Sequence, residues 1–178
     1  MGVDDVAQQI TLTQFVGALN RMPMAIDAAA RLGLDRAARR IVKEAQHRVG
    51  EYQEAEGPFA AWSELSEATK EERRRAGYSD NDPLLRDGTL RDAITHTVES
   101  GMGKHKATIG VKHAMVSHGY SSEPVDIGMV AAVQERGNAH VPPRSFIGGA
   151  GYLLAPVVRD IVGHAVAAAI AGKPLSNR

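Results

Sequence analysis

The residues with the greatest chemical potential in this chain are its histidines, which can act as general bases or bind metal ions near neutral pH. The seven lie at His47, His96, His105, His113, His118, His140 and His164. No two sit four residues apart on a helical stretch with a glutamate between them, so the zinc-hydrolase pattern is absent. We expect scattered surface histidines. The alternative is a small hydrolase or transferase whose site is assembled from His96, His113, His140 and nearby acids.

Two glycine-rich stretches are candidates for phosphate or anion binding. Residues 101–104 do not form a phosphate loop, because the upstream glycine and a following serine or threonine are missing. Residues 148–151 precede a predicted helix, and their free backbone N–H groups could hold an anion. That stretch lacks a preceding strand in a βαβ unit, which argues against a dinucleotide site.

Two charged clusters complete the search for chemistry. Residues 80–82, Asp-Asn-Asp, resemble the start of a calcium loop, but no glycine follows at the needed offset and no glutamate closes the site. Arg36, Arg39, Arg40 and Lys43 would serve a nucleic-acid-binding module, although a solvated helix face with salt-bridge partners is the simpler interpretation. We therefore predict no catalytic residue, no cofactor and no metal site.

Composition places the chain among ordinary globular proteins. It has 178 residues, 43% of them hydrophobic and 24% charged, which is enough for one domain with its own core. The net charge of zero gives no electrostatic reason to expect nucleic acid or an anionic membrane as a partner. The absence of cysteine excludes disulfides and thiol catalysis and fits a cytosolic protein.

A long helix is predicted over residues 24–55, where apolar side chains recur at helical spacing. Pro23 interrupts the pattern, so residues 1–23 are expected to form a separate, variable N-terminal segment. Gly33 weakens the middle of the long helix and predicts a bend or break. Four apolar residues of the N-terminal segment also follow helical spacing: Leu12, Phe15, Val16 and Leu19.

The middle of the chain, residues 56–148, reads as a mixed α+β region. Trp62 is expected to anchor a loop in the core, and Ser66 to cap a short polar helix that lies on the outside or against a partner. Residues 84–94 form a joint, in which an Asp-Gly turn launches a short amphipathic segment. From residue 94 to residue 111 the apolar period becomes two, which predicts an antiparallel hairpin.

The last part of the chain is predicted to return to helix. Residues 116–125 look like a flexible excursion, and residues 128–137 like a short helix closed by a glycine. The most apolar stretch follows and is interrupted by three polar residues, Arg159, Asp160 and His164. We predict a packed helix over residues 150–171 rather than a membrane span, and then a frayed tail over residues 172–178.

These elements define one domain over residues 1–178 of α+β class. It has a long N-terminal helix, a small antiparallel sheet and a C-terminal helix packed on the sheet.

Three segments share an order and a spacing with a known family. Residues 62–69, Trp-Ser-Glu-Leu-Ser-Glu-Ala-Thr, fit W-x-x-L-S-x-x-T, and residues 85–94 contain G-x-L-x-x-(S/A)-I after an aspartate. Residues 133–137 and 141–147 resemble h-x-x-G followed by I-P-x-R-P-F-L, with Ser145 in place of the second proline. Over about residues 58–148 the chain therefore resembles the virion morphogenesis proteins of tailed phages.

The resemblance implies a head–tail connector, neck or tail-completion protein. Members of the family share an α+β fold, act as copies in a ring, usually sixfold, and have no catalytic residues to carry over. The expected partners are further copies of the chain and neck, portal, adaptor, tail-tube or terminator proteins, with no membrane and no specific nucleic acid. The expected location is the virion, and the host cytoplasm during assembly.

Three segments are candidates for assembly contacts: residues 66–77, residues 101–106 and residues 140–146. In a ring, one face of each subunit meets a different face of the next. The alternative for the last segment is that Arg144 and Phe146 simply staple the final helix to the sheet.

Overall fold

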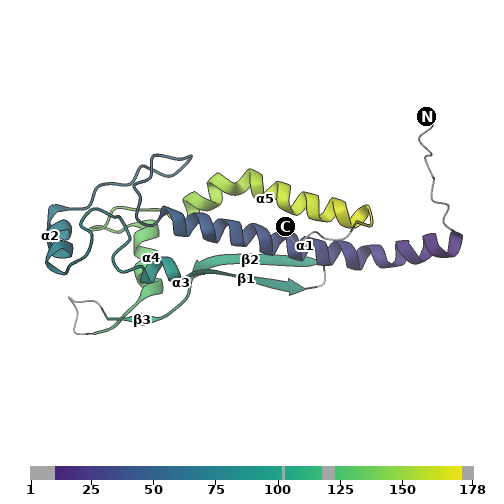
Figure 1. Cartoon of the computed structure of the whole chain (residues 1–178), viewed down its shortest axis with the longest axis horizontal. Coiled ribbons are helices and arrows are strands. Elements are labelled where there is room, and N and C mark those ends of the chain that lie inside the picture. Colours follow the sequence, from purple (N-terminus) through teal and green to yellow (C-terminus); the bar gives the residue numbers. More distant parts are fainter. Residues whose placement is uncertain (1–10, 102, 118–122, 174–178) are drawn as a thin grey trace, which may run out of the picture.

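The computed structural model describes residues 11–101, 103–117 and 123–173. The predicted α+β class is confirmed, with a long N-terminal helix, a small antiparallel sheet and a C-terminal helix. Figure 1 shows these parts running alongside one another, and the shorter elements gather at one end of the molecule.

The spine of the protein is one helix, α1 (Leu12–Arg48), against which the other large elements pack. Helix α5 (Ile147–Ile170) runs along one side of it, and the strands β1 (Ile94–Gly101) and β2 (Lys104–Val111) run along another (Figure 1). In this view α1 forms the middle layer, with α5 and the hairpin on either side of it. The contact between α1 and α5 is the most extensive in the fold.

The predicted limits of the long helix are wrong at both ends. Helix α1 begins far upstream of residue 24, and Pro23 lies inside it. A capping box starts it, in which Thr11 Oγ1 accepts a hydrogen bond from Gln14 N and Gln14 Oε1 accepts one from Thr11 N. A proline removes only one backbone donor, so the helix continues on both sides of it. The helix ends at Arg48, and Gly50 then turns the chain with a φ of 107°.

Gly33 does not break α1; it marks the closest approach of α5. A Cβ atom at Gly33 would lie 3.1 Å from the Cβ of Ala165 and 3.1 Å from the Cα of Val162. Ala29 and Ala37, one turn away on either side, are buried. Small side chains on this face of α1 therefore let two helix backbones come together.

The predicted antiparallel hairpin is confirmed in position, and the structure gives its register. Ile94 lies opposite Val111, and Val98 lies opposite Ala107. Met102, at the tip of the predicted turn, lies outside the described residues. The joint before the hairpin contains helix α3 (Thr89–Ala93), which follows Gly88 at a φ of 88°.

The remaining elements surround the core. They are α2 (Glu67–Arg75), capped by Ser66 as predicted; β3 (Met115–Val116), which pairs with β4 (Val125–Asp126); and α4 (Ile127–Arg136), closed by Gly137 as predicted. The middle of the predicted excursion, residues 118–122, lies outside the described part of the chain.

The core lies where the end of α1 meets α3, α4 and the start of α5. Its largest side chains are Trp62, which anchors its loop as predicted, and Phe146, which is completely buried. The other members of the cluster are smaller or aliphatic: Ala45, Val49, Leu90, Ile94, Ile127, Ala131 and Ala150.

Substitution of Gly33 by leucine tests the close approach of the two helices. We expect the free energy of unfolding to fall by about 1–3 kcal/mol, because the new side chain must displace the backbone of α5. Urea denaturation followed by circular dichroism measures the change. The control is Gly163→Ala in α5, where an added Cβ meets nothing within 4 Å; it should stabilise the protein by about 0.5–1 kcal/mol. An unchanged free energy of unfolding in the Gly33→Leu variant would contradict the close packing of α5 on α1.

Candidate functional site

The histidines of the predicted catalytic alternative do not converge in the structure. His96 Nε2 lies 2.9 Å from Asp35 Oδ1 on α1, and His113 Nδ1 lies 2.6 Å from Asp126 Oδ2, just before α4. His140 belongs to neither pair and lines a cavity. In the described ranges, no three histidine or acidic side chains gather as a metal ion would require.

Two His–Asp pairs instead tie the hairpin to α1. His96 of β1 pairs with Asp35, and His105 Nε2 of β2 lies 3.0 Å from Asp27 Oδ1. The two aspartates are eight residues apart, which places them on one face of the helix. The hydrogen bond with His96 lowers the pKa of Asp35, and Arg39 contributes. His118 lies outside the described residues.

The predicted anion site at residues 148–151 is filled by the protein itself. Helix α5 begins at Ile147, earlier than predicted, and the carboxylate of Glu135 lies across its start. It accepts hydrogen bonds from the backbone N–H groups of Phe146 at 2.9 Å, Ile147 at 2.9 Å and Gly148 at 2.8 Å. The hydroxyl of Ser145 donates another. The anion that this helix terminus binds is therefore an internal side chain.

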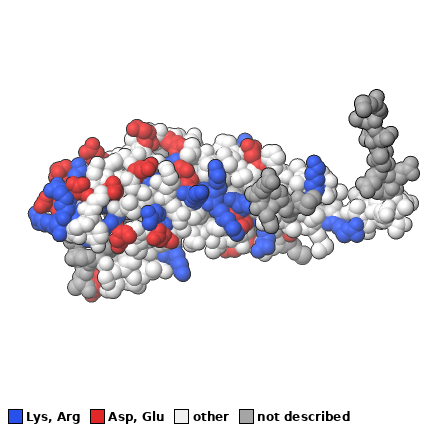
Figure 2. All heavy atoms as spheres, in the orientation of Figure 1, with Lys and Arg blue, Asp and Glu red and all other residues white. Residues whose placement is uncertain are grey.

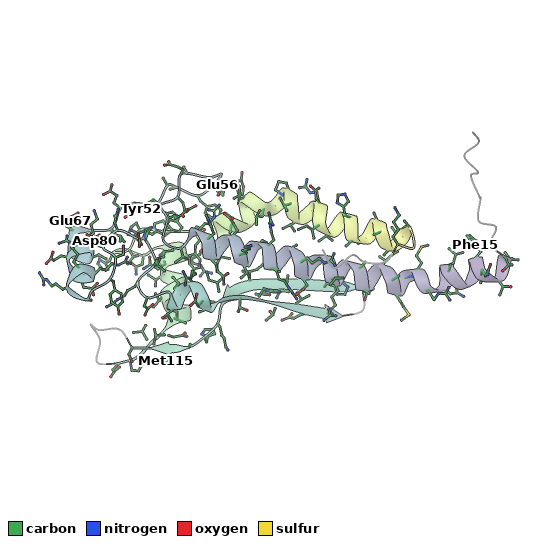
Figure 3. The ribbon with its side chains drawn as sticks, viewed as in Figure 1. Phe15, Tyr52, Glu56, Glu67, Asp80 and Met115 are labelled. Carbon is green, nitrogen blue, oxygen red and sulfur yellow. The ribbon has the colours of Figure 1, made fainter. Side chains whose placement is uncertain are left out.

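The acidic stretch at residues 80–82 also makes internal contacts. Asp80 Oδ2 accepts a hydrogen bond from Arg74 Nε at 3.0 Å, and Asn81 Oδ1 accepts one from the Tyr52 hydroxyl at 3.0 Å. Figure 3 shows Tyr52 and Asp80 at the same end of the molecule. These side chains link the loop to its surroundings.

The basic cluster on α1 is partly paired. Arg39 Nη2 lies 2.8 Å from Asp35 Oδ2, and Arg36 is also engaged. Arg40 and Lys43 are exposed. This agrees with a solvated face that carries salt bridges, and the nucleic-acid alternative stays a prediction.

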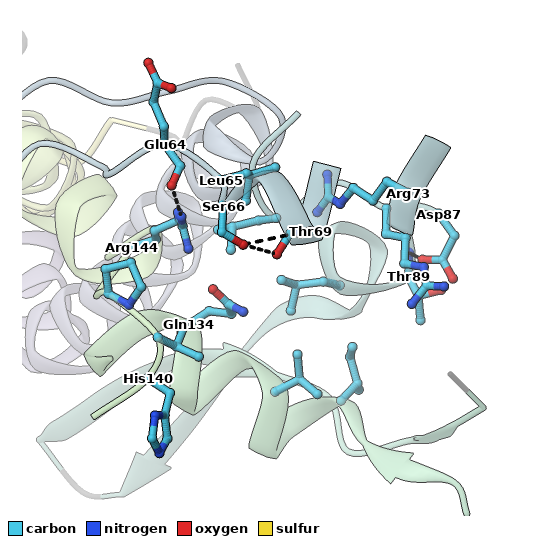
Figure 4. Close-up of a pocket in the computed structure, with 17 residues that line it drawn as sticks. Glu64, Leu65, Ser66, Thr69, Arg73, Asp87, Thr89, Gln134, His140 and Arg144 are labelled. Carbon is cyan, nitrogen blue, oxygen red and sulfur yellow. Dashed lines mark hydrogen bonds between the residues drawn. The ribbon is translucent and has the colours of Figure 1, made fainter. Parts of the chain in front are cut away.

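Two of the three predicted assembly segments meet at one cavity of about 490 Å³ (Figure 4). Residues 66–77 and residues 140–146 form parts of its wall, and the joint at residues 84–94 lies between them in the lining. The predicted turn at residues 101–106 contributes nothing to it. Ten of the lining residues are polar or charged: Glu64, Ser66, Thr69, Arg73, Arg86, Asp87, Thr89, Gln134, His140 and Arg144.

Two of these residues are buried arginines, which the sequence did not single out for burial. Arg73 is 7% exposed, and its Nη1 donates to the carbonyls of Asp82 at 2.6 Å and Leu85 at 3.1 Å. Arg144 is 4% exposed, and its Nη2 donates to the carbonyls of Ser63 at 2.9 Å and Glu64 at 3.3 Å. Burial lowers the pKa of both guanidinium groups, which still carry their charge.

These contacts bear on the staple interpretation of Arg144 and Phe146. Phe146 belongs to the core cluster and lies at the start of α5, so it fastens that helix to the core, as the staple interpretation requires. Arg144, however, holds the loop around Ser63 and Glu64 rather than the sheet. Helix α2 lies on the outside as predicted except at Arg73, which is buried and donates to carbonyls of the loop that follows the helix.

The first three turns of α1 carry an apolar stripe on an arm that projects past the hairpin and past α5 (Figure 1). Leu12 is 78% exposed and Phe15 is 47% exposed. Val16 and Leu19 are exposed in the same way. Figure 3 places Phe15 at the far end of the molecule, away from the other labelled side chains.

Helix α5 has a second exposed apolar surface, which includes Tyr152, Leu153, Val157 and Ile170. It is long and apolar enough by length and composition to cross a membrane, and little of it is buried within the described chain. Figure 2 shows charged side chains crowded at the α2 end of the molecule and sparse on the projecting end of α1.

Comparison with protein-family models, with curated proteins and with solved structures finds no match to this chain. The resemblance to phage virion morphogenesis proteins therefore rests on the three sequence segments alone.

Replacement of Glu135 by glutamine tests the internal cap of α5. One carboxylate oxygen becomes an amide that faces backbone donors, so we expect a loss of about 2–3 kcal/mol in the free energy of unfolding. Chemical denaturation measures it. Glu54→Gln, at an exposed position, should change stability by less than about 0.5 kcal/mol. Equal effects of the two substitutions would show that Glu135 is no cap.

Asp35→Asn tests the clamp between α1 and the hairpin through its pH dependence. A lowered folded-state pKa stabilises the protein above the unfolded value of 3.8, and this contribution is lost as the pH falls through the folded value. The stability difference between wild type and variant should therefore be largest above pH 3.8 and shrink below it. Unfolding measured from pH 2 to pH 7, roughly the range of carboxyl titration, gives this profile. A stability difference that is independent of pH would contradict the clamp.

Proposed function

We propose that this chain is a structural protein of a phage virion, in a head–tail connector, neck or tail-completion ring. It acts by docking to copies of itself and to neighbouring portal, adaptor, tail-tube or terminator proteins. No bond is made or broken in this role.

The observation that carries the proposal is the unpartnered stripe on the arm of α1. Leu12, Phe15, Val16 and Leu19 recur at helical spacing, which is the pattern of a helix that packs on something. No other element in the described part of the chain reaches them (Figure 1). Burial of such a side chain contributes about 1.5–3 kcal/mol, so four together favour association strongly.

The exposed surface of α5 supports the same proposal. The arm and α5 are different surfaces of one chain, and the arm runs away from α5, so they cannot cover each other within a subunit (Figure 1). Two distinct apolar surfaces on each copy allow head-to-tail contacts, which form a ring when the rotation between neighbouring copies closes. The arm is roughly 20 Å long at 1.5 Å per residue, enough to reach a neighbouring subunit.

The internal contacts of α5 favour a protein partner over a lipid one. Its buried face packs on Gly33, and its start is capped by Glu135. Insertion into a membrane would break both contacts. Arg159 and Asp160 would also enter the apolar layer, which is costly.

Size-exclusion chromatography with light scattering tests the proposal on the whole chain. We expect particles several times the mass of 19.0 kDa, and a shift to monomer in the double variant Phe15→Lys, Leu19→Lys. Circular dichroism should be unchanged, because both side chains are exposed. The control is Met129→Lys, at an apolar position on α4 that is more exposed than Phe15 and Leu19 and should leave the particle size unaltered.

Electron micrographs and immunoblots of purified virions provide the second part of the test. A chain that neither self-associates nor co-purifies with virions would overturn the proposal. Recovery of the wild-type chain in washed membranes would point instead to α5 as a membrane span.

A further inference from the structure

The cavity at the α2 end holds an excess of positive charge. Arg73, Arg86 and Arg144 line it, against the carboxylates of Glu64 and Asp87. Arg86 is compensated by Glu72, whose Oε1 lies 3.1 Å from its Nη2. The side chain of Glu64 is 83% exposed and points to solvent.

The two buried arginines are compensated less directly. Asp82 and Glu72 offset the charge of Arg73 without a salt bridge. No carboxylate of the described residues is among the causes that shift the pKa of Arg144. In the described part of the chain, all their hydrogen-bond acceptors are backbone carbonyls, and neither forms a salt bridge. Each raises the electrostatic energy of the other, since Arg73 is among the causes that lower the pKa of Arg144. Buried charges are ordinarily paired with an opposite charge. An anion at the cavity would supply that charge.

Two atoms of lining residues are covered from solvent and have no hydrogen-bond partner among the described residues: the donor Arg144 Nε and the acceptor Gln134 Oε1. Only the donor favours an anion, because an amide oxygen and a carboxylate oxygen are both acceptors. Figure 4 shows the Gln134 side chain reaching toward the middle of the cavity, with Arg144 above it. A buried donor left without an acceptor is destabilising, so a ligand that brings an acceptor is favoured.

Apolar side chains form another part of the wall and set the shape of the ligand. Leu65, Leu84, Leu90, Ile127 and Val130 line it, together with Pro142. Such a surface suits an aliphatic side chain and disfavours a fully hydrated inorganic ion. The volume is that of a pocket for a few residues or a small molecule.

We infer that this cavity binds a carboxylate carried beside an aliphatic side chain on a protein segment, either a chain terminus or an acidic residue. The identity of the partner, a second copy or a neighbouring virion protein, rests on the proposed function. The binding of a carboxylate in the cavity is independent of that function. The cavity then supplies a specific anchor at the charged end of the molecule, separate from the apolar arm of α1.

The test uses N-acetyl-leucine as the probe and N-acetyl-leucine amide as its uncharged counterpart. Protein-observed NMR follows the side-chain Nε–H resonances of the arginines during titration of the full chain. We expect a saturable shift for Arg144 with a Kd on the order of millimolar, as for a ligand of this size. The amide should bind at least about tenfold more weakly, because it cannot make charge-assisted bonds.

Two variants on α4 sharpen the test. Gln134→Glu has nearly the same shape and puts a carboxylate in the lining, so it should abolish the shift. Ala132→Glu adds the same charge to an exposed position of the same helix and should leave binding intact. Circular dichroism confirms that both fold. If Gln134→Glu does not fold, Val130→Phe, which fills the cavity, takes its place.

The results separate this inference from the proposed function. No shift, equal affinity for acid and amide, or unaltered binding by a folded cavity variant would overturn the inference even if rings form. If the chain binds N-acetyl-leucine but never assembles, the carboxylate inference is supported and only the ring proposal is overturned. If the Arg144 resonance of the protein alone shifts with protein concentration, the carboxylate comes from a second copy; otherwise it comes from another protein.

Discussion

The fold depends on the close packing of α5 against α1, which Gly33 makes possible. An added Cβ at that position would touch the backbone of α5 at 3.1 Å, so the distance between the helices is set by the absence of a side chain. With α5 held on one side, α1 presents a different face to the hairpin, where Asp27 and Asp35 receive His105 and His96. One helix thereby positions both large elements. The short elements collect at its C-terminal end, which is where the core and the cavity lie.

Polar side chains do much of the work that large aromatics do in other cores. Aromatic residues are only 4% of the chain, and Trp62 and Phe146 are its buried rings. Around them, charged groups bind backbone atoms: Glu135 holds three N–H groups at the start of α5, and Arg144 holds two carbonyls of the loop after Trp62. These bonds satisfy backbone groups that have no partner in a helix or a sheet. The bonds of Arg144 also leave its positive charge at the cavity. The same side chain therefore stabilises the fold and carries the charge on which the proposed anion binding depends.

Local patterns predicted local structure well. The alternation from Ile94 to Val98 identified a strand of the hairpin, Ser66 and Gly137 identified helix ends, and Trp62 identified a core anchor. Helix limits were missed where a local rule was overridden, as at Pro23, where the capping box and the apolar spacing carry α1 through the proline. The buried arginines and the Glu135 cap could not be predicted, because their partners lie eight or more residues away and a backbone carbonyl or N–H group has no sequence signature. The eight-residue spacing of Asp27 and Asp35 indicated that both lie on one face of the helix, but it could not identify His105 and His96 as their partners.

The proposed role follows from what the fold leaves uncovered. The arm of α1 has the spacing of a packed helix and projects past the hairpin and past α5 (Figure 1), whereas the charged end of the molecule carries the cavity. Hydrogen–deuterium exchange of the backbone amides of residues 12–24, measured at increasing protein concentration, tests this account most directly. It predicts that the arm exchanges rapidly when the protein is dilute and becomes protected as subunits associate, while the α1–α5 contact around Gly33 is protected throughout. Rapid exchange of the arm at every concentration, in particles that have nonetheless assembled, would contradict it.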